Sequence, residues 1–74
     1  MRPSTFTAVI SREGRSFVAL CPALDVASQG PTVARVKPNL VEAVELFLEQ
    51  ADAREIRRRL RADVFVSRFD LSRA

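Results

Sequence analysis

The side chains that could do chemistry in this 74-residue sequence are few, and none stands beside a group that would activate it. Histidine, the commonest general base and the commonest metal ligand, does not occur. Cys21 is the only cysteine. Because a nucleophilic cysteine usually needs a neighbouring base, we expect Cys21 to be a small buried hydrophobic residue. The sequence thus predicts no catalytic residue, no cofactor and no metal site.

Asp25 is the only acidic residue between positions 18 and 32. Two-metal nuclease chemistry needs several carboxylates that converge on the ions. The other acidic residues lie on predicted helices or in exposed turns, so no second acid is placed to pair with Asp25. We therefore expect Asp25 to start a strand or to lie in a turn, and we expect the protein not to be an enzyme.

Arg57-Arg58-Arg59-Leu60-Arg61 is the sharpest charge signal in the sequence. At helical spacing Arg57, Arg58 and Arg61 cluster on one side. One interpretation is a patch that contacts the phosphates of nucleic acid. The other is a solvated helix C-terminus, where cations interact favourably with the helix dipole. We favour the second, because no aromatic residue interleaves with the arginines.

The strands that would position these residues begin with a hairpin. Alternating, β-branched residues predict strands at Thr5–Arg12 and Arg15–Cys21, joined by Glu13-Gly14. In this register Arg12 pairs with Arg15. Side chains that share a face recur every second residue, so the register decides which residues enter the core.

One face of this hairpin is fully apolar and is expected to pack on the core: Phe6, Ala8, Ile10, Phe17, Ala19 and Cys21. The other face is polar near the turn but carries Val9, Val18 and Leu20 at its middle. An exposed apolar patch usually marks an interface. We therefore expect Val9, Val18 and Leu20 to bind a partner.

Pro22 lacks a backbone donor and ends the second strand. Leu24–Gln29 is predicted to be a short edge strand. Gly30-Pro31 breaks it, and Thr32 is a favourable N-cap for the helix that follows.

Apolar residues at steps of three and four predict helix after this cap. Pro38 conflicts with one unbroken helix, because its ring would clash with a carbonyl of the preceding turn. We expect a first turn at Thr32–Val36 and a main helix at Pro38–Asp52. Helical spacing continues through Ala53–Arg61, as one long helix or as two. We prefer two, with Asp52 capping the second.

Val64–Phe69 alternates and predicts a final strand, which gives the order β-β-β-α-(α)-β in a single domain over residues 1–74. Crossover rules place this strand parallel to the first and beside it. The fold class is then α+β, a four-stranded mixed sheet of order 3-2-1-4 with helices on one face. So short a chain buries only about 60–65 % of its unfolded surface, so we expect a homo-oligomer, a dimer or higher.

No apolar run approaches 18 residues, and no signal-peptide pattern occurs. We therefore expect a cytoplasmic protein that does not enter a membrane.

Residues 17–32 (FVALCPALDVASQGPT), followed by residues 39–49 (NLVEAVELFLE), resemble the HicB-like antitoxin family. The family pattern is an aromatic and apolar strand, a Pro-x-Leu pair and a Gly-x-Thr turn. An Asn-Leu-x-Glu-Ala helix that ends in Leu-Glu follows. The match extends from Phe6 to Glu49. The sequence departs from the pattern at Pro38, within the helix, and at Arg35, where Glu is common.

This resemblance implies a partial ribonuclease-H-like fold without that enzyme's catalytic residues. It implies a non-catalytic domain that neutralises a small mRNA-cleaving toxin of HicA type, itself of double-stranded-RNA-binding fold, by binding it. Many members add a C-terminal DNA-binding domain; here we expect a short, stand-alone member without one. The alternatives are a small nucleic-acid-binding module that uses the Arg57–Arg61 patch, and an orphan oligomeric protein.

Overall fold

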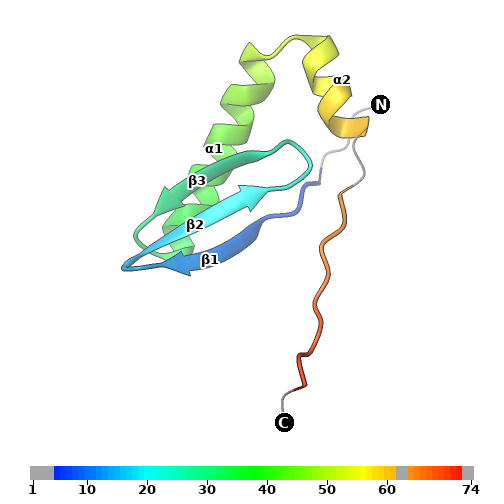
Figure 1. Cartoon of the computed structure of the whole chain (residues 1–74). Coiled ribbons are helices and arrows are strands. Elements are labelled where there is room, and N and C mark those ends of the chain that lie inside the picture. Colours follow the sequence, from blue (N-terminus) through cyan, green and yellow to red (C-terminus); the bar gives the residue numbers. More distant parts are fainter. Residues whose placement is uncertain (1–4, 62–63, 73–74) are drawn as a thin grey trace.

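A three-stranded antiparallel sheet followed by two helices makes up the regular secondary structure of the described residues (Figure 1). The computed structural model describes residues 5–61 and 64–72. The elements are β1 (Val9–Glu13), β2 (Ser16–Cys21), β3 (Val26–Gly30), α1 (Val33–Gln50) and α2 (Ala53–Arg61). The strands lie in the order β1-β2-β3, and α1 packs against β2 and β3.

The turn between β1 and β2 is formed by Gly14 and Arg15, and not by Glu13-Gly14 as predicted. Gly14 has a φ of 62°, and a glycine with positive φ at the first loop position is typical of a type II′ hairpin. Arg12 consequently pairs with Phe17 instead of Arg15. The register differs from the predicted one by two residues. Because side chains alternate with a period of two, the predicted faces keep their members.

The core lies between α1 and the sheet face predicted to be apolar. Ala19 and Cys21 of that face are buried, as expected. Phe6, Ile10 and Phe17 pack half-buried against the same cluster, whereas Ala8 is exposed. The buried cluster consists of Ala19, Cys21, Leu24, Val36, Leu40 and Val44.

The predicted final strand at Val64–Phe69 is wrong. Residues 64–72 contain no regular secondary structure and run away from the sheet (Figure 1). In the described part of the chain the sheet has three strands, all paired antiparallel, so the four-stranded mixed sheet of order 3-2-1-4 is contradicted. Alternation is typical of a strand, but it does not specify the sheet edge with which the chain would pair.

Helix α1 begins as predicted at Thr32, whose Oγ1 accepts a hydrogen bond of 3.1 Å from the backbone N–H of Arg35. The expected restart at Pro38 is wrong, because Pro38 lies inside one continuous helix. Proline removes a single backbone donor here. Val36 and Leu40, on either side of it, are buried against the sheet, and this packing holds the helix together across the missing hydrogen bond.

The prediction of two helices with a bend near Asp52 is confirmed. Helix α1 ends at Gln50, and the N–H of its C-cap Ala51 donates to the carbonyl of Phe47. Asp52 caps α2, since its Oδ1 accepts a hydrogen bond of 2.8 Å from the N–H of Glu55. Within residues 5–61 and 64–72 no helix is long and apolar enough to cross a membrane.

Candidate functional site

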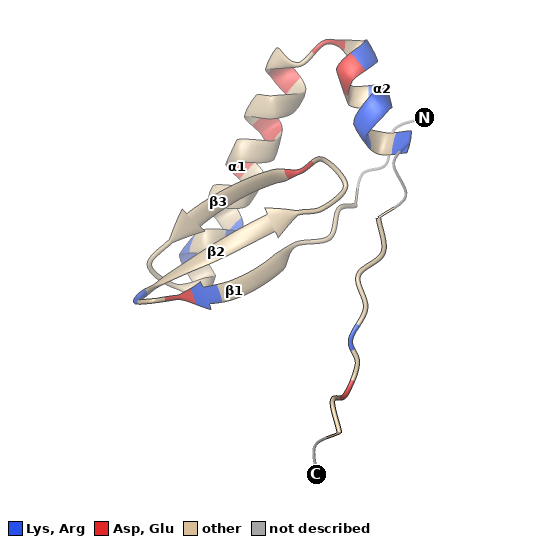
Figure 2. Ribbon diagram, in the orientation of Figure 1, with Lys and Arg blue, Asp and Glu red and all other residues tan. Residues whose placement is uncertain are grey.

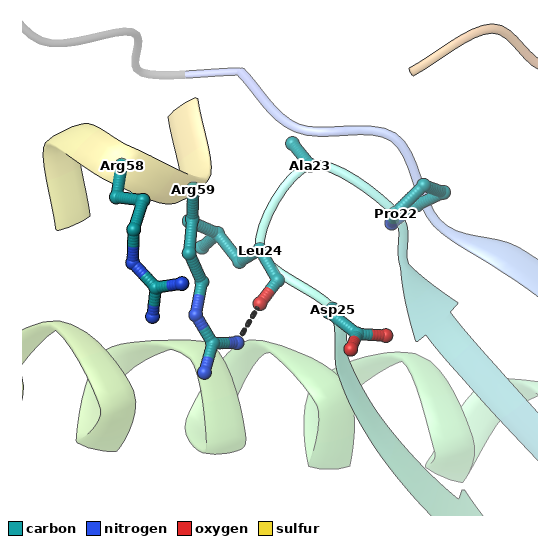
Figure 3. Close-up of a pocket in the computed structure, with 6 residues that line it drawn as sticks. All are labelled: Pro22, Ala23, Leu24, Asp25, Arg58 and Arg59. Carbon is teal, nitrogen blue, oxygen red and sulfur yellow. Dashed lines mark hydrogen bonds between the residues drawn. The ribbon is translucent and has the colours of Figure 1, made fainter. Parts of the chain in front are cut away.

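The turn between β2 and β3 and helix α2 together form a shallow pocket of about 410 Å³ (Figure 3). Its lining comes from Pro22, Ala23, Leu24 and Asp25 of the turn, and from Arg58 and Arg59 of α2. Asp25 adopts the left-handed conformation with a φ of 56°, which aspartate tolerates better than most residues. The prediction that Asp25 is a turn residue is confirmed.

Arg59 holds α2 against this turn. Its Nη1 donates a hydrogen bond to the carbonyl of Leu24, drawn as the dashed line in Figure 3. Its Nε donates to Oε2 of Glu55 over 2.7 Å. The guanidinium also lies 4.6 Å from the centre of the Phe47 ring, within the range of a cation–π interaction. Arg59 therefore joins α2 to both the turn and α1.

Arg58 points into the same pocket but remains exposed, and its Nη2 lies 2.5 Å from Oε1 of Glu55. The hydrogen bond from Arg58, and next the one from Arg59, hold the pKa of Glu55 below its ordinary value. The same hydrogen bond raises the pKa of Arg58. Glu55 thus offsets part of the positive charge at the pocket.

The arginines predicted as a patch do not all serve one purpose. Arg57, Arg58 and Arg61 are exposed on α2, whose ribbon is mostly blue in Figure 2. Arg59, which was not singled out, is half-buried and has a structural role. The spacing of four residues between Glu55 and Arg59 could have identified their ion pair. Its bond to Leu24 joins residues 35 positions apart and leaves no local signal.

The structure brings Val9, Val18 and Leu20 together on one face of the sheet. Val9 pairs directly with Leu20, and Val18 lies two residues from Leu20 on the same strand. Helix α1 lies against the opposite face (Figure 1). Val9 is 38 % exposed, while Val18 and Leu20 are half-buried. That this patch binds a partner remains a prediction.

A second apolar hollow, here called the groove, lies between residues 6–8 and helix α1. Its volume is about 310 Å³. The sequence pattern did not predict this groove, because the residues that face it were expected to be covered in the core. The groove is lined by Phe6, Thr7, Ala8, Cys21, Lys37, Leu40, Val41, Val44, Glu45 and Leu48.

Among the residues that the structure describes, no three His, Cys, Asp or Glu side chains lie close enough to hold a metal ion together. In the pocket the carboxylate of Asp25 points away from the guanidinium groups of Arg58 and Arg59 (Figure 3).

Comparison with protein-family models, with curated proteins and with solved structures finds no match. The resemblance of residues 6–49 to the HicB-like antitoxins accordingly stays a prediction from the sequence.

Proposed function

We propose that this protein is a non-catalytic binding module of the HicB-like antitoxin type, which neutralises a small mRNA-cleaving toxin by covering its surface. The observation that carries the proposal is the open sheet face, where Val9, Val18 and Leu20 form an apolar patch opposite α1. A patch of this kind on a small domain is typical of a protein-binding surface.

The residues behind the family resemblance support the proposal, because they build the junction between β3 and α1. Asn39 Nδ2 donates a hydrogen bond of 3.0 Å to the carbonyl of Gln29. Gly30 lets β3 approach α1 closely, since a Cβ there would lie only 3.0 Å from the Cα of Val36. Thr32 caps the helix. The residues of the motif therefore fix α1 against one face of the sheet, and the other face stays open.

The test is capture of a small toxin by the intact protein. The natural probe is the product of a neighbouring reading frame that resembles an mRNA-cleaving toxin of HicA type. We expect a 1:1 complex by calorimetry and protection of mRNA in a cleavage assay. Val9→Lys places a charge in the patch and should abolish capture, whereas Val33→Lys, on exposed helix surface, should not.

The triple variant Arg57→Ala/Arg58→Ala/Arg61→Ala should also leave capture intact. Val9→Lys binding as tightly as the unchanged protein would remove the sheet face from the proposal. Failure of the toxin-like product to bind or to cleave mRNA would remove the antitoxin function.

A second candidate is a small nucleic-acid-binding module, favoured by the composition of α2, which holds five arginines and one glutamate. Arg57, Arg58 and Arg61 are exposed there and are available to phosphates. Binding to RNA or duplex DNA should then weaken steeply with salt. It should be lost in the triple variant and retained in Val9→Lys, the reverse of the pattern expected for toxin capture.

A further inference from the structure

We propose that residues 64–72, here called the C-terminal segment, add as a fourth strand to the β1 edge of a second copy of this chain. Phe65 and Phe69 of the segment would enter the groove of that second copy. The exchange would be reciprocal, so that each copy gives one segment and receives one. The proposal is independent of the antitoxin function.

The C-terminal segment has the pattern of a strand without a sheet. Phe65, Phe69 and Leu71 are 87 %, 86 % and 76 % exposed. In a strand, residues two apart share a side, so Phe65, Phe69 and Leu71 would lie on one side of the segment once it pairs. Val64, Val66, Arg68 and Asp70 alternate with them and would lie on the other side. Apolar surface exposed to this extent in so short a segment is typical of a chain that is covered by a partner.

The β1 edge offers backbone groups for such a strand. Within the described chain β1 pairs with β2 and has no neighbour on its other side. An open edge presents a row of unpaired N–H and C=O groups that can accept a strand from another chain.

The groove lies next to this edge and fits apolar side chains. Ala8, which points to the same face as the core residues, is small and exposed, and leaves room beside Leu40 and Leu48 of α1. The charged residues in the groove lining are Lys37 and Glu45, one of each sign. Arg68 and Asp70 of the segment alternate with the phenylalanines, so the side of a paired segment that faces the groove carries no charge.

The path of the chain favours a second copy over the molecule's own groove. Val64 and Val66 line another hollow, which shares Phe6 and Thr7 with the groove, but beyond Val66 the segment leaves the domain (Figure 1). The Cα radius of gyration is 14.4 Å. A compact chain of this length has roughly 11 Å. The segment therefore reaches outward, where another copy can receive it.

The area involved is enough for a stable dimer. Two copies contribute four phenylalanine rings, each of which buries about 150 Å² or more when covered, so roughly 600 Å² in total. The grooves that cover them lose a similar area, which brings the sum to roughly 1,200 Å². This is the lower end of the range found for specific interfaces. Each copy has one C-terminal segment and one groove, so a reciprocal exchange covers both segments and fills both grooves.

The first test is the oligomeric state of the full chain by light scattering and sedimentation. The unchanged protein should be a dimer at micromolar concentration. Phe65→Ser/Phe69→Ser, the segment variant, and Ala8→Arg, the groove variant, should each dissociate about 30-fold more readily, the ratio that corresponds to loss of one interface hot spot. Val33→Ser, a matched change of exposed apolar surface on α1, should leave the dimer unchanged.

The second test mixes the two variants. The groove variant keeps an intact segment and the segment variant keeps an intact groove, so together they should form a heterodimer that native mass spectrometry resolves by mass. If each segment folds back onto its own molecule, mixing restores nothing. A heterodimer thus supports exchange, and two persistent monomers overturn it.

A third measurement needs no variant. In a mixed sample of ¹³C-labelled and unlabelled chains, filtered NOEs between the rings of Phe65 and Phe69 and the methyl group of Ala8 should connect different copies. A monomeric unchanged protein, or a dimer that survives both variants, would refute the proposal.

Discussion

Replacement of Arg59 by methionine should detach α2 from the domain. Helix α2 has no fully buried residue, so it depends on a few contacts at its inner side. Methionine keeps an unbranched apolar stem over the Phe47 ring but removes the donor to Leu24 and the charge above the ring. Arg59→Met therefore removes polar and cation–π contacts while it preserves most of the packing.

The expected loss follows from these two contacts. A hydrogen bond from a charged donor contributes about 1.5 kcal/mol, and a partly exposed cation–π interaction about 0.5–1 kcal/mol. Nothing is added for the ion pair with Glu55, which water screens. The free energy of unfolding should fall by about 2 kcal/mol, from a total of roughly 4–11 kcal/mol for a chain of this length. The melting temperature should fall by about 8–16 °C.

Urea unfolding followed by far-UV circular dichroism measures this loss, and hydrogen exchange at the amides of α2 locates it. Arg58→Met is the matched control, because Arg58 is 72 % exposed and bonds only to Glu55 among the contacts described for it. It should change stability little. Equal stabilities of Arg59→Met and Arg58→Met would show that the bond to Leu24 does not hold α2 in place.

Three further changes test the rest of the fold. Gly30→Ala should lower the free energy of unfolding, measured in urea, by about 1–3 kcal/mol. The added Cβ would press on the backbone of Val36, which moves aside less easily than the end of a flexible side chain. Pro38→Ala should raise the melting temperature, with a gain below the full helix-interior penalty of about 3 kcal/mol, because alanine restores a backbone donor in α1 but loosens the unfolded chain. Glu55→Gln should lower the stability of the protein most at neutral pH. Arg58 lowers the pKa of Glu55 below its ordinary 4.5, so the stabilisation is present above that pH and is lost as the pH falls through the lower pKa of the folded state. The difference in stability between the variant and the unchanged protein should accordingly shrink as the pH falls below 4.5, and a difference that stays constant on acidification would contradict this.

The features predicted correctly from the sequence are those whose causes lie within a few residues. Thr32 and Asp52 cap helices because each side chain reaches an N–H three positions later. The hairpin faces were predicted correctly because alternation is preserved under a shift of two residues. The turn was predicted one residue too early, although turn chemistry favours the observed position. A type II′ turn needs positive φ at its first loop residue, which suits Gly14 and not Glu13.

The features that were missed depend on partners distant in sequence. The alternation of residues 64–69 is a local signal for a strand, but a strand also needs a sheet edge to pair with, and the local sequence does not supply one. Pro38 stays helical because buried residues on both sides of it pack on the sheet, and local helix rules do not include that packing.

The arginine run shows why two interpretations of one motif can both apply. A helix turns by about 100° per residue, so four arginines within five positions cannot all face the same way. Arg59 faces inward and holds the turn, whereas Arg57 and Arg61 face the solvent. Arg58 lies between, bonded to Glu55 at the mouth of the pocket. An anion that bound there would compete with Glu55 for Arg58, so the positive charge offered to a ligand is smaller than the sequence suggests. Arg59, which is bonded to the turn, positions the exposed arginines of the same helix.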